Sequence, residues 1–127
     1  MSRTIYTADA PKPAGHYSQG IVENGWLFVS GQLPIDPASG QFVPGTIEEQ
    51  TRRVLDNMAA VVIAAGGSLR DIAKVTLYFS DIAYWPAINA VYAEFFGDHK
   101  PARSAVPTQK LHYGADVEAD AIAFVKG

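Results

Sequence analysis

One arginine stands in an unusual setting near the end of the chain. Arg103 lies within the run PARSAVPT, residues 101–108, among small and apolar neighbours. Arginine is costly to bury and is usually found on the surface. Its planar guanidinium matches a carboxylate through two parallel hydrogen bonds. The setting therefore raises the question of which carboxylate this arginine binds, one of the protein or one of a ligand.

Acidic partners are available on the expected last strand, residues 117–125. Successive side chains of a strand point to opposite faces. On this strand Glu118 and Asp120 share one face with Ile122 and Phe124. The other face is small and apolar and suits packing under helices; it consists of Val117, Ala119, Ala121, Ala123 and Val125. Two acids beside two large hydrophobic residues indicate a half-buried face on which the acids have partners.

Arg103 is a candidate partner because the two final strands, near residues 103–106 and 117–125, could be neighbours in the sheet. Two interpretations stay open. In one, Arg103 forms a structural ion pair with Glu118 or Asp120, as is common in such places. In the other, the guanidinium binds the carboxylate of a ligand, and a nearby carboxylate acts as a general base on a water molecule. The pattern by itself favours neither.

The first half of the chain predicts three strands and a long helix. A short strand is expected at residues 3–7, and the Asn-Gly pair at 24–25 is typical of a type I′ hairpin between two strands. Thr46 and Glu49 have the spacing of a capping box at the start of a helix. Apolar residues then recur at helical spacing as far as the Gly-Gly pair at 66–67, which ends the helix.

The second half predicts a strand, a helix and two more strands. Residues 73–80 alternate apolar and polar side chains, and a second helix should begin near Trp85-Pro86 and end at Gly97. The order β, β-hairpin, α, β, α, β, β describes an α+β domain, expected over residues 1–127, in which two helices cover one face of a mixed β-sheet. The other face needs a cover too, and copies of the same chain would supply it.

The amino-acid composition narrows the partners and cofactors that are expected for this protein. The chain has 127 residues, of which 48% are hydrophobic and only 18% charged, which fits a partly covered exterior. Its net charge is −3 and its basic residues are scattered, so neither nucleic acid nor a membrane surface is an expected partner. Cysteine is absent and the three histidines lack metal-ligand spacing, so no metal is expected. No signal core or membrane span is seen, and a soluble cytoplasmic protein is the expectation.

Weaker candidates lie in or near loops. Gly31, in the run SGQ, is either a strand-end turn or a point where the backbone comes close to a ligand. Tyr17 follows a loop rich in proline and glycine, and is either an exposed loop residue or a pocket wall that offers a hydroxyl. His16 and His112 also lie in loops, where lining a pocket is possible. None of these residues forms a motif by itself.

Six segments, in order along the chain, resemble the RidA (YjgF) family of reactive-intermediate deaminases. They are AGHYSQGIVENGWLFVSGQLPIDPASG, GTIEEQTRRVLDNMAAVVIAAGGSL, DIAKVTLYFSDI, INAVYAEFFG, KPARSAV and VEADAIAF. The resemblance covers almost the whole chain. Several blocks in family order and at family spacing are far more specific than any single motif.

The resemblance implies a chorismate-mutase-like fold and a homotrimer whose sheets line a central β-barrel, with sites in the clefts between subunits. It also implies hydrolysis of 2-aminoacrylate, 2-iminopropanoate and related 2-imino acids to 2-oxo acids and ammonia, without a cofactor or metal. The implied ligand is therefore a small 2-imino or 2-oxo acid. An assembly of copies also follows from the uncovered sheet face, whereas the number of copies comes from the resemblance alone.

The resemblance also assigns roles, residue by residue. The arginine of the family's PARS motif is Arg103, which would bind the substrate carboxylate. The first acid of its E-x-E stretch is Glu118, which would position and activate the attacking water. The tyrosine of the PYSQ-like stretch is Tyr17, a pocket wall from one subunit, and the glycine of SGQ is Gly31, whose backbone approaches the ligand. Asn89, on the second helix, would be a supporting residue.

The chain departs from the family pattern at several places. His16 replaces a proline, Ala105 stands where cysteine is common, and Asp120 is the second acid of E-x-E. His112 and Tyr113 occupy the middle of the common Leu-Pro-x-Gly stretch. None of these changes removes the arginine or the first acid. They bear on which substrate fits.

Two alternatives come from other classes of protein. One is a non-enzymatic trimer that binds small acids or acts as a chaperone-like or regulatory protein; retention of both Arg103 and Glu118 argues against it. The other is an RNA-cleaving inhibitor of translation. The acidic net charge and the lack of a basic groove argue against that reading.

Overall fold

The computed structural model describes residues 2–126, and its elements follow the predicted order. The strands are β1 (Ser2–Ile5), β2 (Gly20–Glu23), β3 (Trp26–Gln32), β4 (Ile72–Phe79), β5 (Ala102–Pro107) and β6 (Val117–Phe124). The helices are α1 (Ile47–Ala64) and α2 (Trp85–Phe96). The strands form one mixed sheet in the order β1-β2-β3-β6-β4-β5. The α+β class is confirmed, whereas the domain limits 1–127 stay a prediction whose end residues lie outside the described ones.

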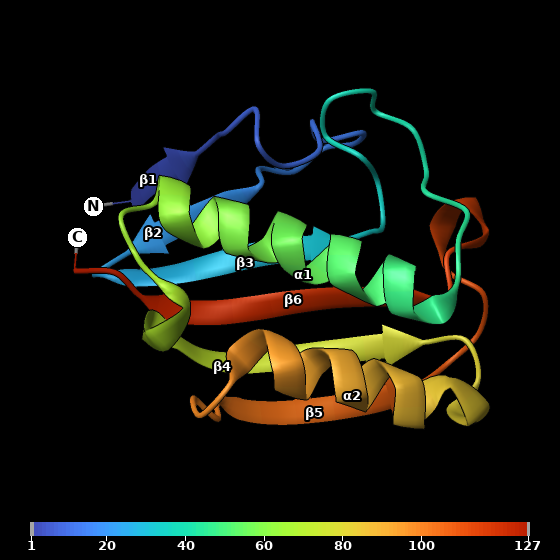
Figure 1. Cartoon of the computed structure of the whole chain (residues 1–127). Helices are drawn as coiled ribbons and strands as arrows, with labels where there is room; N and C mark the ends of the chain where they lie inside the picture. Colours follow the sequence, from blue (N-terminus) through green and yellow to red (C-terminus); the bar gives the residue numbers. More distant parts are fainter. Residues whose placement is uncertain (1, 127) are drawn as a thin grey trace.

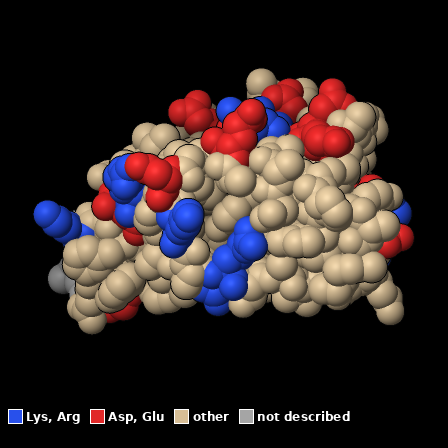
Figure 2. Space-filling model, turned by 60° about the horizontal axis from the view of Figure 1, so that its bottom comes forward, with Lys and Arg blue, Asp and Glu red and all other residues tan. Residues whose placement is uncertain are grey.

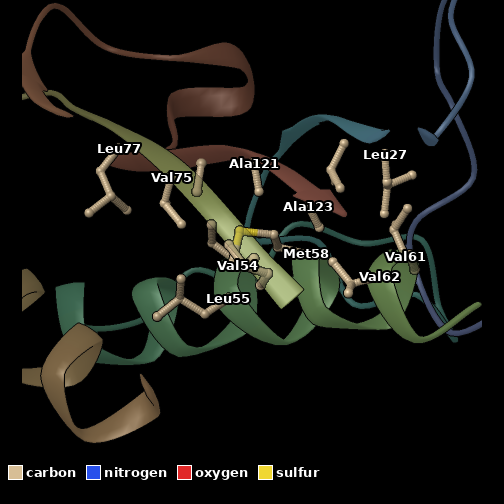
Figure 3. Packing of buried hydrophobic residues seen from close by; sticks show 14 of the residues in the cluster. Leu27, Val54, Leu55, Met58, Val61, Val62, Val75, Leu77, Ala121 and Ala123 are labelled. Carbon is tan, nitrogen blue, oxygen red and sulfur yellow. The ribbon is translucent and has the colours of Figure 1, made fainter. Parts of the chain in front are cut away.

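Both helices pack on the same face of the sheet (Figure 1), as predicted. The core lies between α1 and the central strands, where Met58 of α1 meets Val75 of β4 and Ala121 of β6 (Figure 3). The alanines of β6 are small, so the helix can approach this strand closely. No helix within residues 2–126 is both long and apolar enough to cross a membrane.

Local sequence signals explain where elements begin. The Thr46 hydroxyl accepts a hydrogen bond from the Glu49 amide at 3.1 Å, and the Glu49 carboxylate accepts one from the Thr46 amide at 2.8 Å. This complete capping box starts α1. The β2–β3 hairpin turns at Asn24 and Gly25, whose φ angles of 52° and 83° suit a type I′ turn. Both predictions are confirmed.

The two final strands, β5 and β6, are not neighbours, which corrects the expectation that they could be. Strand β4 lies between them and pairs with β5 in parallel and with β6 antiparallel. The connection explains this order. Parallel neighbours need a crossover, and α2 supplies it by carrying the chain from the end of β4 to the start of β5. Strand β6 then occupies the centre of the sheet, between β3 and β4.

The face of the sheet that the helices leave open carries large aromatic side chains. Trp26, Phe28 and Phe124 are 44%, 48% and 41% exposed. The rings of Trp26 and Phe124 pack edge to face, with centroids 5.0 Å apart. Neighbouring exposed hydrophobic residues of this kind are typical of an interaction surface.

Candidate active site

A pocket of about 380 Å³ opens where β3 ends and β6 begins. Its wall comes from three parts of the chain: the proline-rich loop at 11–17, residues 30–35, and the stretch 112–118. Tyr17, Gly31 and Glu118, all singled out from the sequence, line this pocket together. Segments far apart in the sequence thus meet at one end of the sheet.

Glu118 is the acid of this pocket. It pairs with Tyr78 of β4 and points away from the helices, as its alternation with the buried Val117 requires. Burial raises the pKa of the Glu118 carboxyl, and repulsion from Asp120 raises it further, whereas the charge of His112 opposes the rise. A raised pKa makes this carboxylate a stronger proton acceptor, which suits a general base.

Gly31 makes room for this carboxylate. The pairing of β3 with β6 shifts register between Val29 and Gln32, so Gly31 sits in an irregularity of β3. A Cβ atom at Gly31 would collide with Oε2 of Glu118. Gly31 lies within β3, one residue before its end, rather than in a turn, and an approach of its backbone to a ligand stays a prediction. The backbone of Gly31 makes a close approach, and the group it approaches is the carboxylate of Glu118.

The second acid of β6 lies beside the first. Asp120 accepts a hydrogen bond from the Tyr78 hydroxyl at 3.2 Å. Burial raises the pKa of Asp120, while this hydrogen bond and the charge of Lys74 act in the opposite direction. Burial and the nearby Asp120 also raise the pKa of the Tyr78 hydroxyl. Asp120 therefore acts on the pocket chiefly as a charge that disfavours ionisation of Glu118.

The loop between β5 and β6 brings His112 and Tyr113 to the pocket. Asp116 fixes the end of this loop, because its carboxylate accepts hydrogen bonds from Lys110 at 2.7 Å and from Ser80 at 2.6 Å. Burial alone would raise the pKa of Asp116, but these hydrogen bonds outweigh burial and the pKa lies below its ordinary value. The pocket wall is therefore tied to the end of β4.

Arg103 lies on the other face of the sheet. Its partner on β4 is Val75, which is buried under the helices, so Arg103 also points to the helix-covered side. Its Nη1 donates a hydrogen bond to Oδ1 of Asn89 at 2.8 Å. Its guanidinium carbon lies 4.8 Å from the ring centroid of Trp85 and 4.9 Å from that of Tyr92. Arg103 is thus exposed but held in place.

The residues singled out from the sequence therefore form two groups. One group lines the pocket and consists of Tyr17, Gly31 and Glu118. The other lies at β5 and α2 on the helix-covered side and consists of Arg103, Asn89 and Ala105. Because the sheet separates the two groups, an ion pair of Arg103 with the acids of β6 within one chain is wrong.

Sequence reasoning missed the apolar wall of the pocket. Leu33 and Ile35 line it because the chain after β3 folds back toward α1. The side-chain amide of Asn57 donates hydrogen bonds to the carbonyls of Leu33 and Ile35, at 3.0 and 2.9 Å. A signal was present: Asn57 is a polar residue at a buried position of α1. Such a residue needs hydrogen-bond partners from another segment.

The histidines divide between pocket and surface. His112 lines the pocket, whereas His16 is exposed and is not part of the lining. Within residues 2–126, no three histidine, aspartate or glutamate side chains gather as metal ligands would.

Comparisons with known proteins agree with this fold. The sequence profile of a family described as endoribonuclease L-PSP matches residues 7–125. A RutC family protein of Pyrococcus horikoshii is 48% identical over 98% of each chain. A protein of goat (Capra hircus) named 2-iminobutanoate/2-iminopropanoate deaminase is 40% identical over 97% of this chain and 90% of that protein. The crystal structure of the YjgF gene product of E. coli superposes with a TM-score of 0.91 at 38% identity, over 96% of this chain and 98% of that one.

These matches span nearly the whole chain, and they agree in fold, length and sequence. The chain therefore belongs to the YjgF/RidA family, which the profile describes as endoribonuclease L-PSP. The names of its relatives differ in what they say. The archaeal relative carries only a family name, whereas the goat relative is named for an activity on 2-imino acids.

Proposed function

We propose that this protein hydrolyses 2-imino acids, such as 2-iminopropanoate and 2-iminobutanoate, to 2-oxo acids and ammonia. The observation that carries the proposal is the partly buried carboxylate of Glu118 in a pocket, fitted against Gly31 and with a raised pKa. The goat relative, named for this activity, supports it. A cytoplasmic location, expected from the sequence, is part of the proposal.

The proposed site is completed by a second copy of the chain. Arg103 and Glu118 lie on opposite sides of one sheet, so one molecule cannot direct both toward one small acid. The aromatic residues exposed on the open face supply a surface for assembly. In the proposed homotrimer, the open faces line a central barrel, and Arg103 of one copy meets the pocket of the next.

Arg103 is suited to binding the carboxylate of the substrate. Its guanidinium is exposed, and the contact with Asn89 and the rings of Trp85 and Tyr92 limit its freedom before a ligand arrives. A guanidinium held in this way loses less conformational entropy on binding. Two charge-assisted hydrogen bonds would then orient the substrate.

Glu118 then acts on water. As the water oxygen bonds to the imine carbon, the carboxylate accepts a proton from the water, and the electron pair of the C=N bond moves to nitrogen. Glu118 passes the proton it accepted to this nitrogen, which gives the neutral carbinolamine. Glu118 then takes the hydroxyl proton of the carbinolamine and delivers it to the amino nitrogen, while the C=O bond forms and the C–N bond breaks. Ammonia and the 2-oxo acid leave, and the Glu118 carboxylate is restored.

The description of the family raises RNA cleavage as a second candidate. Binding of RNA needs a continuous basic surface along the phosphate backbone. The net charge of this chain is −3. On the face seen in Figure 2, uncharged residues predominate, and a few basic residues lie apart from one another among them. These observations argue against RNA as the ligand.

A coupled assay tests the proposal. A pyridoxal-phosphate-dependent dehydratase generates 2-iminopropanoate or 2-iminobutanoate, and the disappearance of the imine is followed with and without this protein. We expect faster disappearance and matching release of ammonia. Binding of a 2-oxo acid without any acceleration would instead support the non-enzymatic alternative. Loss of RNA cleavage on rigorous repurification would remove the RNA-cleaving alternative.

A further inference from the structure

The pocket is larger than the smallest substrates of the proposed reaction need. Its volume of about 380 Å³ lies within the range of sites for much larger organic ligands, roughly 300–1,000 Å³. In 2-iminopropanoate, only a methyl group extends beyond the reacting carbon and the carboxylate. In a single chain the pocket therefore has room beside the reacting atoms, and its lining shows which kind of side chain would fit there.

Two tyrosines at the wall of the pocket favour an apolar or aromatic group. Tyr17 and Tyr113 line it, and they are 50% and 62% exposed in the free chain. The ring of Tyr113 lies beside that of His112, with centroids 6.5 Å apart. Aromatic rings bury much apolar area when a ligand covers them, and they also contribute specific ring contacts. Both rings are therefore available to a ligand.

Tyr113 is held in a conformation that its own side chain disfavours. Its φ and ψ angles are 62° and 16°, in the left-handed region. Such a backbone is unfavourable for a bulky residue and tends to occur at functional sites. The turn around it is fixed, because the Gly114 amide donates to the Leu111 carbonyl and Lys110 donates to the Gly114 carbonyl, both at 3.1 Å. The fold thus keeps a large ring at this point of the wall.

The other residues that line the pocket also suit an apolar or aromatic group of the ligand. Leu33 and Ile35 add aliphatic surface, and Asn57 fixes the backbone that carries them. Lys12 also lines the pocket, and its positive charge disfavours a cationic side chain on the ligand. Aliphatic and aromatic groups together match a neutral, bulky side chain.

We infer that this pocket prefers 2-imino acids with large apolar side chains, aromatic ones above all, and that Tyr113 sets the preference. The inference rests on the proposed function. With the carboxylate of the substrate on Arg103 of a second copy and its imine carbon at Glu118, the side chain of the substrate is left to meet Tyr17, Tyr113 and the aliphatic wall.

Imines made in the cuvette from alanine, leucine and phenylalanine test the preference. An amino acid oxidase generates each imine, and semicarbazide competes with the protein for it, so lost semicarbazone measures hydrolysis. We expect kcat/KM for the imine from phenylalanine to exceed that for the imine from alanine by about tenfold or more. A wild-type protein that hydrolyses the alanine-derived imine best overturns the inference and leaves the proposed function standing.

Variants of Tyr113 identify the residue responsible. Tyr113→Gly removes the ring and suits the left-handed backbone, so the fold is preserved; we expect the ratio of the two kcat/KM values to fall by about fivefold. Tyr113→Phe keeps the ring and should keep the ratio. Tyr6→Ala is the matched control, since Tyr6 is 60% exposed but lies outside the pocket lining. An unchanged ratio in Tyr113→Gly overturns the role of Tyr113.

Binding separates failure of the inference from failure of the proposed function. If none of the three imines is hydrolysed, the proposed function fails. Calorimetric titration with phenylpyruvate and pyruvate still tests the pocket, because it needs no turnover. Tighter binding of phenylpyruvate, reduced in Tyr113→Gly, supports the inference, whereas equal binding of the two acids overturns it.

Discussion

The two sides of the sheet hold their charged residues under opposite conditions. On the helix-covered side, Arg103 is exposed on the edge strand β5 and carries a permanent charge among aromatic rings. On the open side, Glu118 lies on the central strand β6, partly buried in a pocket, and burial raises its pKa. The guanidinium of Arg103 is exposed to solvent, whereas the carboxylate of Glu118 is partly removed from it.

This difference suits two different tasks. A carboxylate becomes a stronger proton acceptor when it is partly removed from water, which a pocket achieves. A guanidinium that must reach a ligand in another subunit has to lie at an edge of the molecule. Strand β5 is such an edge. The comparison therefore predicts that activity needs both sides, contributed by different copies.

Removal of the exposed charge should have the largest effect. Arg103→Ala is expected to lower kcat/KM for 2-imino acids by at least about 100-fold, because two charge-assisted hydrogen bonds to the substrate are lost. The assembly should persist in size-exclusion chromatography with light scattering. Arg70→Ala is the control, since Arg70 forms an exposed ion pair with Asp98 and lies outside the pocket lining. Full activity in Arg103→Ala would exclude a role in carboxylate binding, and a collapsed assembly would point to a structural role instead.

Mixing two inactive variants tests whether the two sides come from different copies. Chains with Arg103→Ala and chains with Glu118→Gln are refolded together, and mixed assemblies are isolated through two different affinity tags. In each mixed trimer one interface of three joins an intact Arg103 to an intact Glu118, so the isolated assemblies should regain roughly a third of the wild-type activity. Mixed assemblies without any activity would contradict a site shared between copies.

A methyl group at the pocket should be the next most damaging change. Gly31→Ala places a Cβ atom against Oε2 of Glu118, so the carboxylate must move. We expect kcat to fall by roughly tenfold to 100-fold, as for other displacements of a catalytic group by about 1 Å. Adding Glu118→Asp should recover part of the loss in steady-state assays, because a shorter side chain withdraws from the new methyl. Wild-type kcat in Gly31→Ala would show that Glu118 needs no such room.

The pH dependence should respond to the neighbouring acid. The proposed base must be ionised, so the rate falls as pH falls through the raised pKa of Glu118. Asp120 contributes to that raised pKa, so Asp120→Asn should move the acidic limb of the kcat/KM profile to lower pH. Burial is the larger cause and remains, so the shift is partial. Asp56→Asn, on the exposed side of α1, should leave the limb in place.

Asp120 should also make the free energy of unfolding depend on pH, in a direction that can be measured. Its pKa is raised on folding, so between its ordinary and its raised pKa the folded state binds more protons than the unfolded state. Stability from this group is therefore present at low pH and is lost as pH rises through that window. Asp120→Asn should flatten this decline in urea unfolding measured at several pH values. A decline that is steeper in the variant would contradict the assigned shift.

The smallest effect on activity is expected from a substitution on the helix-covered side. Thr46→Ala removes the capping box of α1 and should lower the free energy of unfolding by about 1 kcal/mol. The kcat/KM for imines should stay unchanged, because α1 packs against the buried face and carries no proposed catalytic group. Thr46→Ser, which keeps the hydroxyl, is the matched control in chemical denaturation. A large loss of activity without loss of stability would mean that the two sides are coupled.

Several features of the fold could be predicted because they depend on neighbours in the sequence. The capping box at Thr46, the type I′ turn at 24–25 and the alternation along β6 each arise within a few residues. The alternation even placed Glu118 and Asp120 on the face opposite the helices. Such features depend on residues that are close together in the sequence.

The chain by itself thus determined its elements, their order and the face on which each acid lies, because these follow from local periods of two and of 3.6 residues. Only the tertiary structure decided that β4 separates β5 from β6 and that β3 shifts register beside Gly31. It also decided that Arg103 donates a hydrogen bond to Asn89 and does not pair with an acid. Strand order and register depend on which distant segments pair and on which crossovers are possible. No local pattern of residues specifies which strands pair. The sequence therefore left Arg103 and Glu118 as possible partners, whereas the structure places them on opposite sides of the sheet.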